Sequence, residues 1–592
     1  MDAPHSPINI SIPLTYDMFF DDTPKDIIEY LRGIGRHKLV ELALYIINSH
    51  NLLRQFNKFL GFVCSENNRN FCESLMVKYF KHTNDAKFPR YYAVSERTGL
   101  NLLRYSFSLP ALTTQSSADT ITEDQNIVKA ILLINKENIE CVVEEDNGVE
   151  YDEKLAAGLF CEQWNIFTGA LEKHSELSLI SQFIRGVYFF KYCENTPSFN
   201  QILRDFLEIK GYATWGDYLC DMIKLSLFPL KLEHNKDCTF FRISLDSSNP
   251  DYSKRVLMFR NLSSTISDVI ELSDNEDCKI FRGKPLIQVS ETEFWCINAQ
   301  FCINQLFESL FFQFKGLVEA KKYDVDIFRE YTTDFAERTL FYDMVRRLFN
   351  GRAYIKLSGD EMSQIHPELK GEPDYYIRNG NKIFLFENKD IRIAADIHGC
   401  KSYNSVKSAI FNKLVSKPRH KNSKVGITQI IANIKRIVNG DFLWDKGVRN
   451  PKIYPILVVN DPVFSLPGIN FIINKEFQKL LQELDIPSNI KIHPIILINM
   501  DVLIHYSGYF NTKILSFENV LNGFIRNITT PVQSLNPRKV IDNILKSYFS
   551  FSTYMISVYH PVIGNDQIDN MLDELHEMVY GRKLDKLNTA YR

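Results

Sequence analysis

The sequence EPDYYIRNGNKIFLFENK at residues 372–389 carries the strongest fold information in this chain. At its centre stands Asn379-Gly380, a pair that strongly favours a two-residue hairpin turn because both residues accept positive φ angles. β-prone residues lie on both sides of the pair. With a two-residue loop formed by this pair, Asp374 is expected opposite Leu385. The stretch therefore predicts two antiparallel strands joined by a tight turn.

Three polar side chains are expected to meet on one face of this hairpin. Directly opposed residues point to the same face, and faces alternate along each strand. Asp374 should then share a face with Glu387 and Lys389, whereas the flanking acids Glu372 and Asp390 should point to the other face. A slip of one residue in the pairing would separate Asp374 from the other two. The turn therefore controls whether two carboxylates and a lysine converge.

Two carboxylates and a lysine at a strand end suit metal-dependent phosphodiester hydrolysis. Carboxylate oxygens suit a hard ion such as Mg²⁺, which binds through one or two carboxylates together with water and substrate phosphate. Such an ion polarises the phosphoryl group, activates water and stabilises the leaving oxygen. The carboxylates favour the charged form of Lys389, so we expect this lysine to position water and stabilise transition-state charge. The expected cofactor is Mg²⁺, with Mn²⁺ as a substitute.

The arrangement resembles the PD-(D/E)xK nuclease superfamily, which has the restriction-endonuclease-like fold. Pro373-Asp374 matches the "PD" of that family, and Glu387-Asn388-Lys389 matches its "ExK". The resemblance implies that Asp374 and Glu387 are catalytic metal ligands. It also implies that Lys389 is the catalytic lysine that positions water.

The resemblance extends to the segments on both sides of the hairpin. Residues 335–349 show helical periodicity, and family members often carry a metal-assisting glutamate on this helix, which makes Glu337 a further metal-ligand candidate. Residues 426–435 look like the following helix, on which many members carry a glutamine near the site, and Gln429 is the matching catalytic candidate. The apolar run 454–459 then completes the expected αβββαβ order.

Each candidate residue also has an ordinary structural interpretation. For Asp374, Glu387 and Lys389 the alternative is a solvated strand end that holds an ion pair, and for Glu337 and Gln429 it is a surface position on a helix. The bare motif occurs by chance in roughly one chain in ten of this size. The resemblance to the nuclease family therefore depends mainly on the turn, the shared face and the order of the flanking elements. It covers about a third of the 592 residues.

Composition sets broad limits on the class of protein. With 592 residues and 45% hydrophobic content, the chain can bury several cores. It contains no apolar run of the roughly 18 residues that a membrane helix needs, and its start is polar, so we expect a cytoplasmic protein without membrane association. Eleven cysteines without CxxC spacing indicate neither a disulfide framework nor a structural zinc site.

The distribution of charge favours a nucleic-acid partner more than the net charge of -3 suggests. Residues 351–460 contain 19 Lys and Arg against 10 Asp and Glu, a local excess of nine positive charges. Basic side chains that neutralise phosphates release counterions, so a basic loop beside the hairpin is expected to contact nucleic acid, although a solvated flexible loop is the alternative. The candidate contacts are Lys413, Lys417, Arg419, Lys421 and Lys424.

These observations predict a multidomain α+β chain. Residues 1–230 should be mostly helical and serve recognition, regulation or assembly, and residues 231–320 should form a mixed α/β connecting region. Residues 321–530 should form the nuclease-like domain, with a mixed central sheet flanked by helices. Residues 531–592 should form a helical C-terminal segment.

Three functions from different classes follow. The first is a Mg²⁺-dependent nuclease, with DNA rather than RNA as the expected substrate. Its N-terminal region is expected to recognise a signal, a protein partner, a second copy of the chain or a feature of the substrate. That logic suits a prokaryotic restriction or anti-phage defence effector. The second is an inactive nuclease-fold subunit that binds nucleic acid or assembles a complex. The third is a hydrolase of another phosphorylated substrate. No GxxxxGK[ST] loop occurs, so an ATP motor is not expected within this chain.

Overall fold

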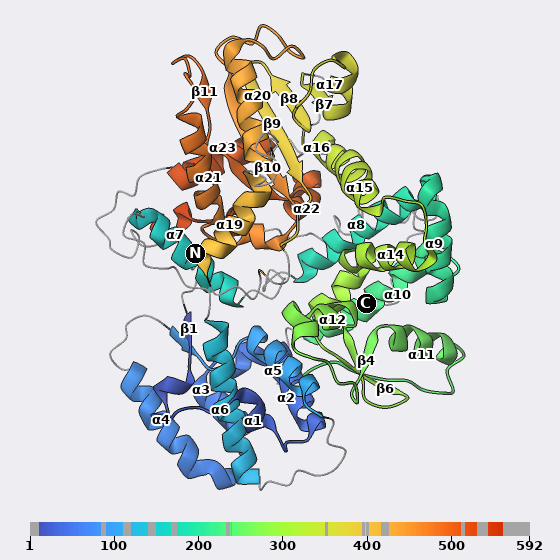
Figure 1. Ribbon diagram of the computed structural model, residues 1–592, viewed down its shortest axis with the longest axis vertical. Coiled ribbons are helices and arrows are strands. Elements are labelled where there is room, and N and C mark those ends of the chain that lie inside the picture. Colours follow the sequence, from blue (N-terminus) through green and yellow to red (C-terminus); the bar gives the residue numbers. More distant parts are fainter. Residues whose placement is uncertain are drawn as a thin grey trace.

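A helical N-terminal part, a small sheet and a large mixed sheet give this chain a mixed α+β architecture (Figure 1). The computed structural model describes residues 11–83, 90–110, 120–139, 150–166, 175–232, 237, 239–349, 353–393, 397, 402–415, 425–510, 515–529 and 543–559. The large sheet lies at the top of Figure 1 and the N-terminal helices lie at the bottom.

The N-terminal part is predominantly helical, as its sequence periodicity predicts. A short parallel pair, β1 and β2, is its only sheet within the described residues. Its elements are β1 (Ser11–Pro13), η1 (Tyr16–Met18), α1 (Ile27–Leu31), α2 (Arg36–Leu53), α3 (Phe56–Val63), η2 (Glu66–Asn68), α4 (Arg69–Thr83), β2 (Arg90–Tyr92), α5 (Glu96–Ser108) and α6 (Thr120–Asn138).

The middle of the chain combines long helices with a four-stranded sheet in the order β3-β6-β5-β4. Phe240, Ile287 and Trp295 pack into the same core as α2, α5 and α6, so this small sheet is covered by the N-terminal helices. The elements are α7 (Tyr151–Ile166), α8 (Ser175–Asn195), α9 (Pro197–Lys210), α10 (Trp215–Leu232), β3 (Arg242–Ser244), α11 (Tyr252–Asn261), β4 (Ser263–Thr265), η3 (Ser273–Cys278), α12 (Lys279–Gly283), β5 (Leu286–Gln288), β6 (Glu293–Cys296), α13 (Ala299–Ile303), η4 (Asn304–Leu306) and α14 (Glu308–Lys321).

The large sheet has the strand order β11-β10-β9-β8-β7, with β12 also paired to β10. Strands β7, β8 and β9 are antiparallel neighbours, whereas β9, β10, β11 and β12 run parallel. Its elements are α15 (Ile327–Arg329), the π-helix η5 (Glu330–Phe341), α16 (Tyr342–Leu348), β7 (Ile355–Ser358), α17 (Gly359–Ile365), β8 (Tyr375–Asn379), β9 (Lys382–Lys389), α19 (Tyr403–Leu414), α20 (Ile427–Asn439), β10 (Lys452–Val459), η6 (Pro462–Ser465), α21 (Ile469–Leu481), β11 (Lys491–Ile492), β12 (Ile496–Asn499), α22 (Met500–Phe510), α23 (Phe517–Thr529) and α25 (Phe551–Tyr559).

The hairpin between β8 and β9 is present, but its turn lies one residue later than predicted. Asn379 pairs with Lys382, so the loop consists of Gly380 and Asn381. Gly380 has a φ angle of 60°, which suits a type II′ turn, because that turn places glycine at its first central position. Only the glycine adopts the left-handed backbone here, so Asn379 remains in the strand.

This correction moves the pairing by two residues and leaves the faces unchanged. Tyr375 pairs with Phe386, so Asp374, the residue before it, comes opposite Glu387 rather than Leu385. Since side chains alternate with a period of two, an even shift keeps each residue on its predicted face.

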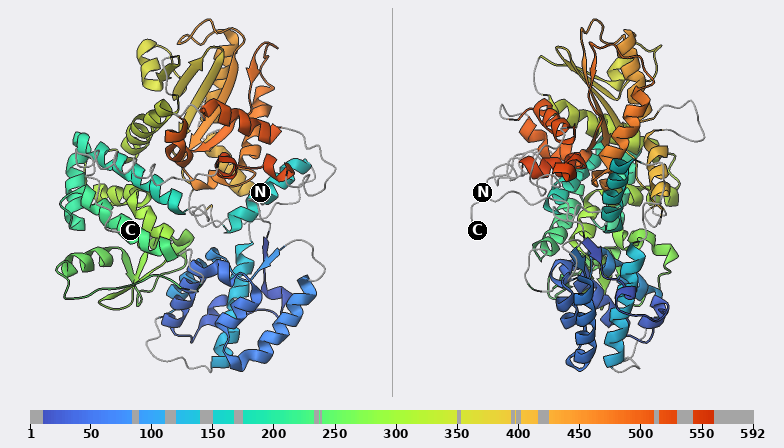
Figure 2. Two further views of the ribbon diagram at one scale, coloured as in Figure 1. Left: turned by 180° about the vertical axis from the view of Figure 1, so that it is seen from behind. Right: turned by 90° about the vertical axis from the view of Figure 1, so that its left-hand side faces the viewer.

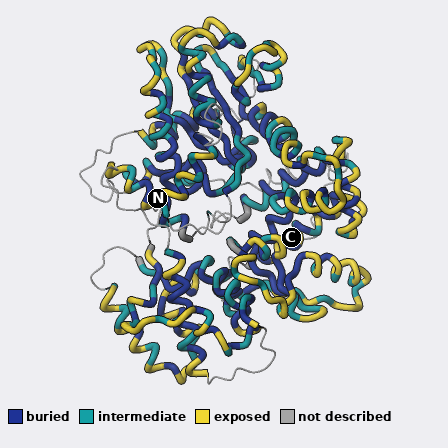
Figure 3. The backbone as a smooth tube through the Cα atoms, viewed as in Figure 1, coloured by how far each residue is buried: buried dark blue, intermediate teal, exposed yellow. Residues whose placement is uncertain are grey.

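The two faces of the large sheet belong to different hydrophobic cores. Phe384 and Phe386 pack on one face with α8, α16, α22 and α23, whereas Ile383 and Leu385 pack on the other with α7, α19, α20 and α21. Figure 2 shows helices on both sides of the strands, and Figure 3 shows the strands as a buried layer. Strand β10 is buried at every position after Lys452, as expected for a strand between parallel neighbours with both faces covered.

Two helices from the N-terminal half pack directly against the large-sheet region. Helix α7 contacts α21, and α8 contacts α22 and η5. Glu153 on α7 forms ion pairs with Lys407 at 2.6 Å and Lys475 at 2.9 Å. Arg185 on α8 binds Asp501 at 2.7 Å. Helices α7 and α8, which both precede residue 230, therefore share hydrophobic cores with the large sheet. In the described part of the chain, no helix combines the length and apolar character required to cross a membrane.

Candidate functional site

Asp374, Glu387 and Lys389 converge at one end of the β8-β9 hairpin. Lys389 Nζ lies 2.6 Å from Glu387 Oε1 and 3.8 Å from Asp374 Oδ2. The main-chain N–H of Asn388 donates a hydrogen bond of 2.7 Å to Asp374 Oδ2. The shared face predicted from alternation is confirmed, because both carboxylates contact the same lysine.

Glu387 is the most deeply buried member of this group. Its side chain is 0% exposed, compared with 12% for Asp374 and 22% for Lys389. Within the described part of the chain, Glu387 Oε2 has no hydrogen-bond partner. A buried carboxylate oxygen without a partner is costly, so it is poised to accept a cation or a donor from a ligand.

The electrostatics of the group favour proton retention on the acids and charge on the lysine. Burial, followed by the charge of Asp374, raises the pKa of Glu387 well above its usual range. Burial also raises the pKa of Asp374, against the opposing effect of Lys389. Burial disfavours the charged lysine, but Glu387 and Asp374 outweigh it and raise the pKa of Lys389. The direction of this shift is the one expected for a lysine that rests in its charged form.

Glu337 lies near this group on the π-helix η5, in which the Tyr342 N–H reaches back five residues to the Glu337 carbonyl. Tyr342 Oη also donates to Glu337 Oε1 at 3.3 Å. Burial and the charge of Asp374 raise the pKa of Glu337 to about 8. Among the described residues, no group of three or more His, Cys, Asp or Glu side chains is arranged to hold a metal ion. Glu337 is thus an electrostatic neighbour of Asp374 and Glu387, and the three do not form a compact ligand set.

Gln429 lies near the start of α20 and contacts the backbone that leads into the site. Its Nε2 donates to the carbonyl of Glu372 at 3.2 Å. Helix α20 is held there by Ile430 and Ile434, which are buried one turn apart, as in an amphipathic helix packed on a sheet. The structure therefore connects Gln429 to the Pro373-Asp374 segment rather than to the carboxylates.

Two residues near the site, Tyr342 and Glu372, were not predicted from the sequence. Tyr342 follows Glu337 by five residues, a spacing that an ordinary α-helix does not bring together, and the π-helix makes the contact. Glu372 was assigned to the opposite face, yet its charge raises the pKa of Asp374. Its Oε1 accepts a hydrogen bond from Ser363. The strand pairing ends at Tyr375, so strict alternation no longer governs Glu372.

A cleft of about 840 Å³ lies beyond the carboxyl end of β9, where Asp390 and Ile391 line it, whereas Asp374, Glu387 and Lys389 are not part of its described lining. Lys413, one of the predicted phosphate contacts, lines it and donates to the carbonyl of Arg392 at 2.5 Å. Phe312 is 57% exposed and lies under the Arg392 guanidinium, with 5.3 Å between the guanidinium carbon and the ring centroid. The other predicted contacts, Lys417, Arg419, Lys421 and Lys424, lie outside the described residues.

The residues present fit a hard divalent cation. Mg²⁺ takes one or two protein carboxylates and completes its shell with water and substrate oxygens, so three protein ligands are not required. Asp374 and Glu387 supply two adjacent carboxylates, and Oε2 of Glu387 is unpartnered among the described residues. These two side chains would hold the ion.

Comparison with known proteins adds no relative from which a family can be assigned. The chain matches none of the protein-family models searched, and no curated protein matches its sequence.

Proposed function

We propose that this chain is a metal-dependent nuclease of the PD-(D/E)xK type that hydrolyses phosphodiester bonds in DNA. The observation that carries the proposal is the meeting of Asp374, Glu387 and Lys389 at the ends of two paired strands. The order of the elements gives partial support: α16, β7, β8, β9, α20 and β10 follow the αβββαβ order of that fold, with α17 inserted between β7 and β8 and α19 between β9 and α20. A bound Mg²⁺ or Mn²⁺ would polarise the phosphate and activate water.

The chain's own residues have separate roles in this proposal. Asp374 is held by the Asn388 main chain and presents its carboxylate to the ion, together with Glu387. The charged Lys389 orients the attacking water and stabilises negative charge on the phosphate. We place the DNA beside this point, in the cleft that begins at Asp390 and is lined by Arg392 and Lys413.

The N-terminal half is proposed to control cutting. Helices α7 and α8 are tied to the large-sheet region by the Glu153–Lys407 and Arg185–Asp501 ion pairs. A partner, a second copy or a signal that binds the N-terminal region can therefore act on the site through packed helices. A restriction or anti-phage defence role fits a nuclease under such control, by analogy of architecture alone.

A nuclease assay on the full chain tests the proposal. Purified protein is incubated with single- and double-stranded DNA and with RNA, in Mg²⁺, Mn²⁺ or chelator. Metal-dependent products should disappear in Asp374→Ala and Lys389→Ala. They should persist in Lys382→Ala, which changes the same residue type at the opposite end of β9. Cutting that survives both site variants would sink the assignment.

A nucleic-acid-binding subunit without catalysis is the second candidate. It is favoured by the lack of a three-residue ligand group among the described side chains and by the contact of Gln429 with main chain instead of the carboxylates. Salt-sensitive DNA binding without cutting in any metal would support it. Hydrolysis of a small phosphate ester without attack on nucleic acid would instead indicate a different phosphohydrolase.

A further inference from the structure

Three lysines lie in one row across the large sheet, far from the candidate nuclease site. Lys452 of β10 is in register with Lys382 of β9 and with Lys491 of β11. Like charges on adjacent strands repel one another. Lys382 is neutralised by Glu518 at 2.5 Å, but within the described residues Lys452 and Lys491 have no acidic partner. This end of the sheet therefore carries uncompensated positive charge.

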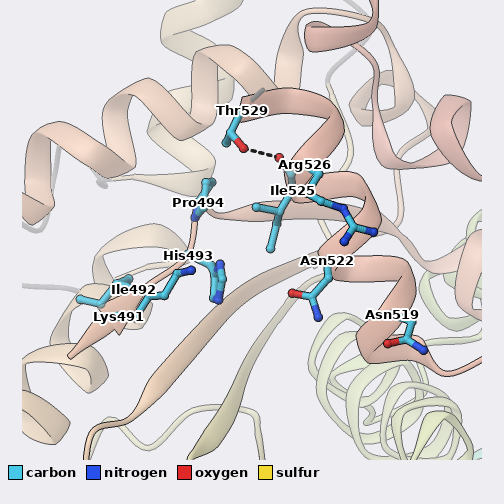
Figure 4. A pocket seen from close by; sticks show the side chains of 9 residues that line it. All are labelled: Lys491, Ile492, His493, Pro494, Asn519, Asn522, Ile525, Arg526 and Thr529. Carbon is cyan, nitrogen blue, oxygen red and sulfur yellow. Dashed lines mark hydrogen bonds between the residues drawn. The ribbon is translucent and has the colours of Figure 1, made fainter. Parts of the chain in front are cut away.

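An open pocket of about 510 Å³ adjoins this row, between the edge strand β11 and helix α23. Figure 4 shows Lys491 and His493 on the strand side, across from Asn522 and Arg526 on the helix. Arg526 adds a second cation to the lining, and the described residues provide no ion-pair partner for it. Ile492, Pro494 and Ile525 supply an apolar part of the wall. The pocket thus combines cations with a surface for carbon atoms.

Two polar side chains of the pocket, His493 and Asn522, are held by contacts within the protein. His493 is only 7% exposed, and its ring stacks on Tyr454 with centroids 4.3 Å apart. Tyr454 Oη donates to Asn522 Oδ1 at 3.0 Å, which leaves the Asn522 amide N–H groups as donors. Burial, followed by the charges of Lys491 and Lys452, lowers the pKa of His493 to about 4. At neutral pH this ring is uncharged and retains one N–H donor.

We propose that this pocket binds a small phosphorylated ligand, with its phosphate between Lys491 and Arg526 and its organic part against Ile492 and Ile525. Phosphate suits the site because cations and amide donors surround the opening and the described residues of the lining include no carboxylate. The size is that of a small-molecule site, since such pockets commonly span roughly 300–1,000 Å³ and bind ligands larger than a bare phosphate ion.

This inference does not depend on the proposed nuclease function. Lys382 begins β9 and Lys389 ends it, so the pocket and the candidate site lie at opposite ends of the same strand. The ligand can be bound whether or not the chain cuts DNA. Conversely, loss of cutting in Asp374→Ala leaves ligand binding unchanged.

The experiment measures binding of inorganic phosphate and AMP to the full chain by ³¹P NMR titration at constant ionic strength. Wild type should bind both probes, and AMP more tightly because its organic part contacts the apolar wall. Lys491→Gln with Arg526→Gln should weaken binding about a hundredfold, at about tenfold for each charged hydrogen-bond donor removed. Asn519→Asp, which places a carboxylate in the lining, should weaken it as well.

The control removes the same two charges at exposed positions on the N-terminal helices, as Lys58→Gln with Arg69→Gln, and should bind both probes like wild type. Circular dichroism and thermal melting verify that every variant is folded. Failure of wild type to bind either probe, or equal affinity in the pocket and control variants, overturns the proposal. Weakened DNA binding in the pocket variant, without binding of phosphate or AMP by wild type, also overturns it and assigns the surface to nucleic acid.

Discussion

The main-chain N–H of Asn388 holds the side chain of Asp374 by a hydrogen bond of 2.7 Å to Oδ2. This bond crosses from the segment before β8 to the end of β9, where Glu387 and Lys389 flank Asn388. The donor belongs to the backbone, so the position of Asp374 follows from the strand pairing and not from the identity of the side chain at 388. The pairing thereby places one carboxylate beside the other.

Asp374→Asn is expected to reduce cleavage by about a hundredfold or more, because it removes the negative charge that holds the cation. The fold should tolerate the change, since the asparagine oxygen can still accept from Asn388. Initial cleavage rates and thermal melts measure the two effects. Asp251→Asn, at an exposed position in the small-sheet part, serves as the control. Wild-type cutting by Asp374→Asn would contradict the role assigned to Asp374.

Lys389→Met is expected to lower the free energy of unfolding by about 3 kcal/mol at a pH above the raised pKa of Glu387, where the substitution leaves a buried carboxylate without its cation. Adding Glu387→Gln to that variant should recover most of the loss, since the uncompensated charge is then gone. Urea unfolding of the two variants and wild type, in chelator, makes the comparison. Equal destabilisation of both variants would show that packing, rather than charge, connects the two residues.

Glu337→Gln should change how stability depends on pH. The pKa of Glu337 is raised from its usual 4.5 to about 8. A raised pKa means that the folded state favours the proton, so this contribution is full below pH 4.5 and is lost as pH rises through about 8. In chelator, the melting temperature of the variant minus that of wild type should therefore increase as the pH is raised from about 5 to about 9. Parallel curves would disprove the shift.

Gly380→Ala should destabilise the chain by about 1–2 kcal/mol, because alanine is strained in the left-handed region. The φ angle is 60°, and a Cβ atom there would meet no atom within 4 Å, so the cost is one of backbone conformation. Gly316→Ala provides the opposite case, in open space on helix α14. Alanine should stabilise that helix by up to about 1 kcal/mol. Urea titrations of both variants measure the difference, and a neutral Gly380→Ala would disprove the turn geometry.

Removal of the four basic residues Lys417, Arg419, Lys421 and Lys424 should flatten the salt dependence of DNA binding. Each phosphate contact contributes about 0.9 to the slope of log K against log salt, so the change for all four is expected at about 3–4. Lys413→Gln alone should change the slope by less than one contact, because its Nζ already bonds the Arg392 carbonyl. Fluorescence anisotropy at several salt concentrations measures these slopes. An unchanged slope in the fourfold variant would show that these four residues do not contact the DNA.

Short-range sequence patterns were sufficient to predict the hairpin and the convergence of Asp374, Glu387 and Lys389. The turn residue pair, the alternation of faces and the periodicity of 335–349 and 426–435 are all properties of neighbouring residues. Such properties predicted the order of these elements but not helix α17, between β7 and β8, or helix α19, between β9 and α20. The turn position was wrong by one residue, since two consecutive candidates compete and only Gly380 takes the positive φ angle. The prediction that Asp374, Glu387 and Lys389 share a face was still correct, because the pairing shifted by two residues and an even shift keeps each side chain on its face.

Contacts between segments that are far apart in the chain could not be predicted from the sequence. The partner of Gln429 depends on where α20 crosses the sheet, and the approach of Glu337 depends on the π-helical turn at Tyr342. The packing of α7 and α8 on the large-sheet region likewise joins segments separated by hundreds of residues.

The lysine row is the clearest case of this limit. Lys382, Lys452 and Lys491 are unremarkable surface residues in the sequence, and they become neighbours only through the register of three parallel strands. Parallel strands are joined by long connections, so no turn chemistry fixes that register locally. It is set instead by the burial of β10 between its neighbours, which is a property of the packed sheet as a whole.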